Sequence, residues 1–177
     1  GSVTSLSGPS GERFGVSAGK GAEVVMGELN KGAGPATYNQ GGFGGRKSAS
    51  VVIEETGGAT KQVQERRNLY QRDNVDAVIG YIGSGDCLAV APIAEELKKP
   101  LFLFDCGTPR IFEEAKYNYV FRTAAHATQD NVGLIRYMKM KNIKMDTFSA
   151  INQDYAWGQD SRADFVAAAG QLYPNAK

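Results

Sequence analysis

Residues 75–104, VDAVIGYIGSGDCLAVAPIAEELKKPLFLF, carry the clearest structural pattern in this chain. A run over 75–82 that is apolar except for Asp76 precedes the glycine turn 83–86, and a helical apolar pattern follows over 88–97. The continuous apolar run 101–104 then indicates a strand that is buried on both faces. Two strands joined by a helix form a βαβ unit, whose strands lie parallel in one sheet.

The same alternation continues on both sides of this stretch. Strands are predicted over 3–6, 49–53, 75–82, 101–104, 119–122 and 147–151, and helices over 18–29, 59–72, 88–97, 130–141 and 159–172. Because Pro92 lies inside a helical pattern, we expect that helix to begin near Ala91 or to kink there. The alternation predicts an α/β fold, with a doubly wound parallel sheet and helices on both faces.

Ligands of open α/β sheets bind beyond the carboxyl ends of the strands. The loops that follow four of the predicted strands are therefore the first candidates for a binding site. They span residues 7–14, 83–86, 105–110 and 152–158.

The composition narrows the class of function. Of 177 residues, 42% are hydrophobic and 22% are charged, which is typical of a globular domain and excludes a disordered chain. The net charge of +1 leaves no excess of positive charge for a phosphate backbone, so we expect no nucleic-acid partner. No apolar run approaches the roughly eighteen residues of a membrane span. The two cysteines permit one disulfide at most.

Two short patterns are typical of enzymes with a serine nucleophile. Residues 15–19 fit G-x-S-x-G, and residues 17–20 fit S-x-x-K. The first pattern requires a buried strand that runs into the serine, but the polar turn 11–14 precedes Ser17 instead. The only histidine, His126, follows no acidic motif that would orient it. An α/β hydrolase that uses Ser17 is therefore the less favoured alternative, and we expect a protein that is not an enzyme.

The remaining patterns give no cofactor site. Residues 83–85 read G-S-G between a strand and a helix, but Leu88 stands where a dinucleotide fingerprint has its third glycine. The chain has no G-x-x-x-x-G-K-[ST] motif, and an isolated His126 fits a surface or helix-capping role better than a metal ligand. We expect no metal and no cofactor.

Five segments in combination resemble one known family. They are residues 5–9 with Phe14 and Gly15, residues 41–47, residues 90–96, residues 120–123 and residues 154–160. In this order the chain resembles the type I periplasmic solute-binding proteins of ABC importers, in particular those for branched-chain amino acids. Members of that family are about twice as long, so the chain looks like an N-terminal fragment with a clipped first strand.

The resemblance implies two α/β lobes that close over a small solute. Residues 1–123 would form lobe one, and residues 124–177 the opening helix, strand and helix of lobe two. It also implies a periplasmic location and delivery of the solute to a membrane permease. The chain begins with Gly1 and Ser2 rather than Met, which we interpret as a cloning scar or trimmed end, with any signal peptide removed.

The resemblance also implies a set of ligand-binding residues. Ser84 matches the serine that holds the solute's carboxylate, and the amino end of the following helix favours such a negative group. Cys106 and Thr108 match a loop whose carbonyl and hydroxyl hold the ammonium and carboxylate. Phe14 and Trp157 match aromatic residues that pack against the ligand from lobe one and lobe two.

We expect the solute to be a small amino acid or an aromatic or aliphatic carboxylate. Asp86 departs from the family pattern, because it places a negative charge beside the expected carboxylate site. A periplasmic protein meets oxidising conditions, so we also expect a disulfide between Cys87 and Cys106. The alternative within binding proteins is the ligand-sensing domain of a regulator, which shares the fold.

Overall fold

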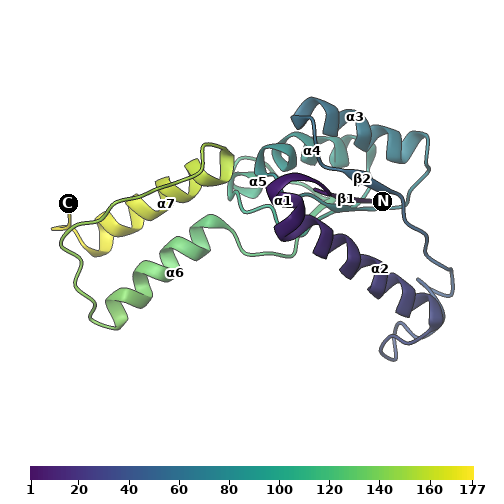
Figure 1. Ribbon diagram of the computed structural model, residues 1–177, viewed down its shortest axis with the longest axis horizontal. Helices are drawn as coiled ribbons and strands as arrows, with labels where there is room; N and C mark the ends of the chain where they lie inside the picture. Colours follow the sequence, from purple (N-terminus) through teal and green to yellow (C-terminus); the bar gives the residue numbers. More distant parts are fainter.

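The computed structural model describes residues 1–177 and contains one five-stranded sheet with α-helices packed mainly on one face (Figure 1). The strands are β1 (Ser2–Thr4), β2 (Val52–Glu54), β3 (Val78–Gly80), β4 (Leu101–Leu103) and β5 (Val120–Arg122). The helices are α1 (Gly8–Ser10), α2 (Val16–Lys31), α3 (Gly58–Gln71), α4 (Ser84–Leu97), α5 (Arg110–Glu113), α6 (Ala127–Met140) and α7 (Ala156–Leu172). A π-helical turn, η1 (Gly11–Gly15), joins α1 to α2.

The sheet confirms the predicted fold class. All neighbouring strands are parallel, in the order β2-β1-β3-β4-β5. This is one of the common orders of a doubly wound α/β sheet, in which the direction of winding reverses between β1 and β3.

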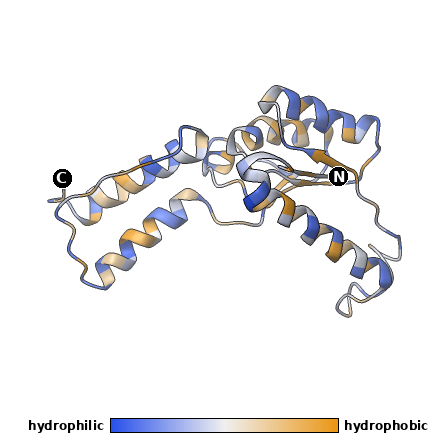
Figure 2. Ribbon diagram, in the orientation of Figure 1, coloured by the Kyte–Doolittle hydropathy of each residue, from blue (hydrophilic) through white to orange (hydrophobic).

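One face of the sheet forms the main hydrophobic core. Helices α3 and α4 cover this face, and Figure 2 shows that hydrophilic residues make up much of α3. The buried core residues include Val3, Val78, Leu101, Leu103 and Val120 of the strands, Leu69 and Tyr70 of α3, and Val90, Ala91 and Ala94 of α4. Burial of these apolar side chains is the main term that fixes the carboxyl ends of the strands relative to α4.

The opposite face of the sheet has much less cover. Strand pairing places Val52, Ile79, Phe102 and Phe121 in one lateral row, and the first, second and fourth are 42–48% exposed. The start of α2 lies at this face, where the Thr4 hydroxyl donates to the Gly15 carbonyl at 3.2 Å. Further along, α2 leaves the sheet and contributes no buried residue (Figure 1).

Helices α6 and α7 form a separate pair beside the sheet (Figure 1). The two helices lie side by side and point in the same direction. The segment that connects them therefore runs back from the end of α6 to the start of α7. Ile135 of α6 and Ala168 and Ala169 of α7 form a small buried cluster of their own. None of the helices in the chain has the length and apolar character needed to cross a membrane.

The strand predicted over 147–151 is wrong. This segment lies in the connection that returns from α6 to α7, but it pairs with no strand, and Ile151 is fully exposed. Its backbone hydrogen bonds involve Lys177 instead: the Phe148 N–H donates to the Lys177 carbonyl, and the Lys177 N–H donates to the Asp146 carbonyl. A strand needs a neighbour to accept its backbone hydrogen bonds, and this chain offers none beside α6 and α7.

Two further local expectations are corrected. Residues 7–14 were expected as a loop, yet α1 and η1 continue directly into α2. The helix that contains Pro92 was expected to begin near Ala91 or to kink there; it begins at Ser84, so the first of these two alternatives is wrong. Pro92 lacks only one backbone N–H, and the buried α4 face compensates for that lost hydrogen bond.

Candidate ligand-binding site

A pocket of about 340 Å³ lies beyond the carboxyl ends of β1, β2 and β3. It sits where the direction of winding reverses, which is the usual ligand position in open α/β sheets. The lining residues come from these strand ends, from α1 and α4, and from the segment before α7: Ser5, Ser10, Glu55, Ile82, Gly83, Asp86, Gln153 and Tyr155. A small organic molecule fits a pocket of this size.

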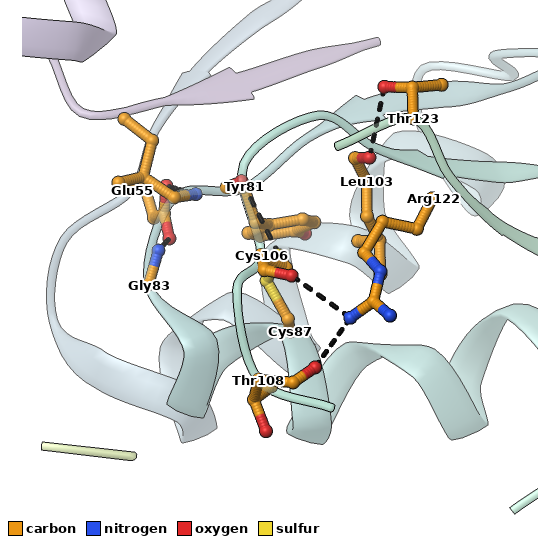
Figure 3. Close-up of a disulfide and its surroundings, with 10 residues drawn as sticks. Glu55, Tyr81, Gly83, Cys87, Leu103, Cys106, Thr108, Arg122 and Thr123 are labelled. Carbon is orange, nitrogen blue, oxygen red and sulfur yellow. Dashed lines mark hydrogen bonds between the residues drawn. A yellow bond between two sulfur atoms is a disulfide. The ribbon is translucent and has the colours of Figure 1, made fainter. Parts of the chain in front are cut away.

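Glu55 is the most buried charged group at this pocket, and only 7% of it is exposed. Its backbone N–H donates to the Thr4 carbonyl at 3.0 Å, which extends the pairing of β2 with β1. Its carboxylate accepts hydrogen bonds from the amides of Ile82 at 2.7 Å and Gly83 at 2.6 Å (Figure 3). The side chain therefore connects β2 to the start of α4.

Burial raises the pKa of Glu55 from 4.5 to about 7. The two amide donors lower this pKa, whereas the neighbouring carboxylates of Asp86 and Asp105 raise it. Burial also raises the pKa values of Asp86 and Asp105 themselves. Two carboxyl groups that line the pocket, Glu55 and Asp86, and the nearby Asp105 thus favour their neutral forms more than isolated carboxyl groups do.

The backbone at the end of β3 has an unusual conformation. Tyr81 has a φ of +93°, in the region that favours glycine, and its side chain is fully buried. A non-glycine residue keeps such a conformation only when its surroundings hold it there. This turn precedes the amides of Ile82 and Gly83 that contact Glu55.

Ser84 is the first residue of α4. It directly follows Gly83, which lines the pocket. Its side chain is 1% exposed, and its hydroxyl has no hydrogen-bond partner. A buried hydroxyl without a partner is costly, so a ligand atom that bonded to it would gain free energy. The assignment of Ser84 to ligand binding stays a prediction.

Hydrogen bonds within the protein hold the loop after β4 in place. The guanidinium of Arg122 donates to the carbonyls of Cys106 at 3.3 Å and Thr108 at 2.6 Å (Figure 3). The Thr108 hydroxyl donates to Asp160 of α7 at 2.6 Å. The two groups that the family resemblance assigns to the solute therefore have partners within the protein, and neither lines the pocket.

Trp157 packs against the same loop. A side-chain carbon added at Gly107 would collide with the indole ring, so the two residues are in close contact. The backbone N–H of Ala127 also donates to the Gly107 carbonyl at 2.8 Å. Trp157 does not line the pocket, but Tyr155 does. The ring centroids of Tyr155 and Trp157 lie 6.3 Å apart.

Cys87 of α4 and Cys106 of the β4 loop are joined by a disulfide (Figure 3). Their Cα atoms lie 6.4 Å apart, and both residues are fully buried. The bridge ties the start of α4, beside Gly83, to the loop that contacts α7.

The remaining candidates lie away from this pocket. Phe14 lies on η1, is 53% exposed and does not line the pocket. Ser17 lies exposed on α2, as expected for a helical residue. His126, for which a surface or helix-capping role was expected, is the N-cap residue of α6, and its backbone N–H donates to the side-chain oxygen of Gln129 at 3.2 Å.

Sequence reasoning missed Glu55 and Tyr155. Glu55 directly follows the second strand, at the edge where ligands bind, and this position was the available signal. Tyr155 belongs to the same segment, 154–160, as Trp157, and this segment was the available signal. Asp86 was noted only as a departure from the family pattern, but it lines the pocket.

The comparisons with known proteins identify the family. The model of the family described as "Periplasmic binding protein" matches residues 1–174, and the chain belongs to this family. Proteins of this family bind solutes and do not transform them, so the expectation of a protein that is not an enzyme holds. No curated protein sequence matches the chain.

Solved structures show the same fold. An ABC transporter solute-binding protein from Rhodopseudomonas palustris, in complex with 4-hydroxybenzoate, matches 97% of this chain at 21% identity and a TM-score of 0.74. A substrate-binding protein from Desulfitobacterium hafniense, in complex with Leu, matches 97% at 19% identity and 0.76. A branched-chain amino acid transporter protein from R. palustris matches 99% at 25% identity and 0.62. The chain spans 43%, 47% and 44% of their respective lengths.

Proposed function

We propose that this chain is the solute-binding part of an extracytoplasmic receptor that serves an ABC importer. It binds a small amino acid or an aromatic or aliphatic carboxylate and delivers it, unchanged, to a membrane permease. The observation that carries this proposal is the pocket at the switch point of the sheet, bounded by strand ends on one side and by Gln153 and Tyr155 on the other.

The solute class draws support from both the pocket and the relatives. Tyr155 offers an aromatic surface, while Ser5, Ser10 and Gln153 offer hydrogen-bonding groups around it. The similar proteins were solved with 4-hydroxybenzoate and with Leu, each a small molecule with a carboxylate. A periplasmic location follows from the same proposal, since importers of this kind collect their solutes outside the inner membrane.

The proposed lobes are residues 1–123 and residues 124–177. Two separate hydrophobic clusters support this division, one spanning Val3 to Val120 and the other centred on Ile135. The loop after β4 connects them through its contacts with Ala127, Trp157 and Asp160.

Native mass spectrometry of the protein purified from its own host tests this function. A small molecule that co-purifies identifies the solute, and calorimetry then gives its affinity. We expect Ser84→Ala to weaken that affinity roughly ten- to a hundredfold, because it removes a hydrogen bond to a charged group. The exposed Ser149→Ala serves as the matched control. An unchanged affinity in Ser84→Ala would place the ligand elsewhere.

A further inference from the structure

The start of α4 holds a carboxylate that belongs to the protein. The amides of Ile82 and Gly83 both donate to Glu55, and all three residues line the pocket. Paired backbone amides at the beginning of a helix are a common binding site for a ligand carboxylate or phosphate. Here the chain supplies a carboxyl group of its own, from the end of another strand.

The strand order explains how Glu55 reaches these amides. Its side chain starts at the end of β2, crosses the end of β1 and meets the loop after β3. The hydrogen bond from its own N–H to Thr4 fixes the backbone from which the side chain extends. Ser5, at the end of β1, lines the pocket between the two.

The charged groups around Glu55 do not stabilise its carboxylate. No lysine or arginine of the chain forms an ion pair with it, and the ionisable groups that face it are Tyr81, Asp86 and Asp105. Two backbone amides therefore stabilise its carboxylate, while the charges of Asp86 and Asp105 disfavour it, although Asp86 also shares a side-chain hydrogen bond with Glu55. A buried carboxylate with this balance is open to exchange for another carboxylate on the same amides.

We propose that Glu55 is an internal competitor for the solute's carboxylate and thereby determines the selectivity of the pocket. This inference rests on the proposed function. A solute that places a carboxylate at the start of α4 must displace Glu55, whereas a solute with a neutral amide or hydroxyl at that end binds without displacing it. Removal of the Glu55 carboxylate makes the two amides available to an external one.

Acetate is the simplest probe of these amides. In Glu55→Ala, we expect acetate to shift the amide proton signals of Ile82 and Gly83 saturably, as measured by NMR against chloride at equal ionic strength. The wild-type chain should show no such shift, because Glu55 already occupies both donors. Glu54→Ala is the matched control: it removes the adjacent carboxylate, which bonds to Ser7 and not to these amides.

A second variant keeps this test decisive if Glu55→Ala does not fold. Glu55→Gln retains the shape of the side chain but presents a neutral amide, which accepts backbone hydrogen bonds less strongly than a carboxylate. Acetate should then shift the same two signals saturably, at higher concentrations than in Glu55→Ala, while the wild type still shows no shift. The inference is overturned if acetate does not shift the amide proton signals of Ile82 and Gly83 in the folded variant.

The consequence for solutes is measured with a matched pair of compounds, 4-hydroxybenzoate and 4-hydroxybenzamide. We expect Glu55→Ala to raise the affinity for the acid by about tenfold and to leave the affinity for the amide nearly unchanged. An equal change for both compounds would overturn the selectivity claim. If no solute binds but acetate still shifts the Ile82 and Gly83 signals in Glu55→Ala, the proposed function is wrong. The inference that Glu55 competes with an external carboxylate for these amides is then still supported.

Discussion

The hydroxyl of Thr108 donates a 2.6 Å hydrogen bond to a carboxylate oxygen of Asp160, although 52 positions separate the two residues. Thr108 belongs to the loop after β4, and Asp160 belongs to α7. Two other contacts join the same loop to the same helix pair, from Gly107 to Ala127 and to Trp157. One short loop thus connects the main core to the α6–α7 pair.

Thr108→Val should loosen this connection. The substitution keeps the shape of the side chain but leaves the Asp160 carboxylate without its donor, which should cost about 1.5 kcal/mol of unfolding free energy. Chemical denaturation gives the stability, and the emission of Trp157, the only tryptophan, reports on the contact itself.

Thr128→Val is the matched control for this prediction. Thr128 donates to Asp164 at 2.9 Å, so the same chemistry is lost, but within the α6–α7 pair. It should lower stability without shifting the Trp157 emission. If both variants shift that emission equally, the Thr108 contact has no special role in joining the loop to α7.

Gly107→Ala should displace the indole of Trp157. An added methyl group would occupy the position of the ring, so either the ring or the loop must move. We expect a red shift of the Trp157 emission as the ring becomes more hydrated, together with a loss of stability of about 1–3 kcal/mol.

Gly133→Ala in α6 provides the contrast, because nothing lies within 4 Å of the added methyl group. Alanine is a better helix former than glycine, so this variant should gain about 0.5–1 kcal/mol. A Gly107→Ala protein with the parent's emission spectrum would show that the indole does not pack on this loop in solution.

The main sheet could be predicted from the sequence because its strands are recognisable one at a time. The run 101–104 is apolar throughout and follows Pro100, and the glycine turn 83–86 ends the run before it, so the α/β class follows from local pattern alone. The failure at 147–151 has a physical cause. Its pattern is typical of a strand, but pairing depends on neighbours that no local pattern supplies.

The pocket was predictable in position but not in composition. The switch-point rule places ligands beyond the strand ends, and the pocket lies there. The role of Glu55 depends on β2 lying next to β1, so that a side chain after one strand reaches the loop after another. Individual strand patterns do not reveal which strands are neighbours, so Glu55 could not be distinguished from any other polar residue at a strand end.

The disulfide between Cys87 and Cys106 should stabilise the chain. Its two cysteines are 19 positions apart, and closing a loop of this length contributes about 3 kcal/mol by restricting the unfolded chain. Denaturation with and without reductant should show a loss of this size. The double variant Cys87→Ala/Cys106→Ala should be insensitive to reductant. Alkylation of two free thiols in the denatured, unreduced protein would contradict the bridge.

Glu55 should make the stability of the protein depend on pH. Its pKa is about 7 in the folded chain, against an ordinary value of 4.5, because burial disfavours the charged form. Between these two values the folded state retains a proton that the unfolded state releases. The contribution of Glu55 is therefore fully present below about pH 4.5. It is lost as the pH rises towards 7, by an amount on the order of 3 kcal/mol.

Glu55→Gln isolates this contribution, because it removes the titrating group and keeps its shape. Asp86 and Asp105 also have raised pKa values, and their effect on the pH profile remains in the variant. The difference in unfolding free energy between wild type and variant, measured by denaturation from pH 4 to pH 8, should therefore change mainly between about pH 4.5 and pH 7. A wild-type stability that rises relative to Glu55→Gln across this window would mean that the folded protein favours the Glu55 carboxylate. The two amides would then outweigh burial and the neighbouring carboxylates.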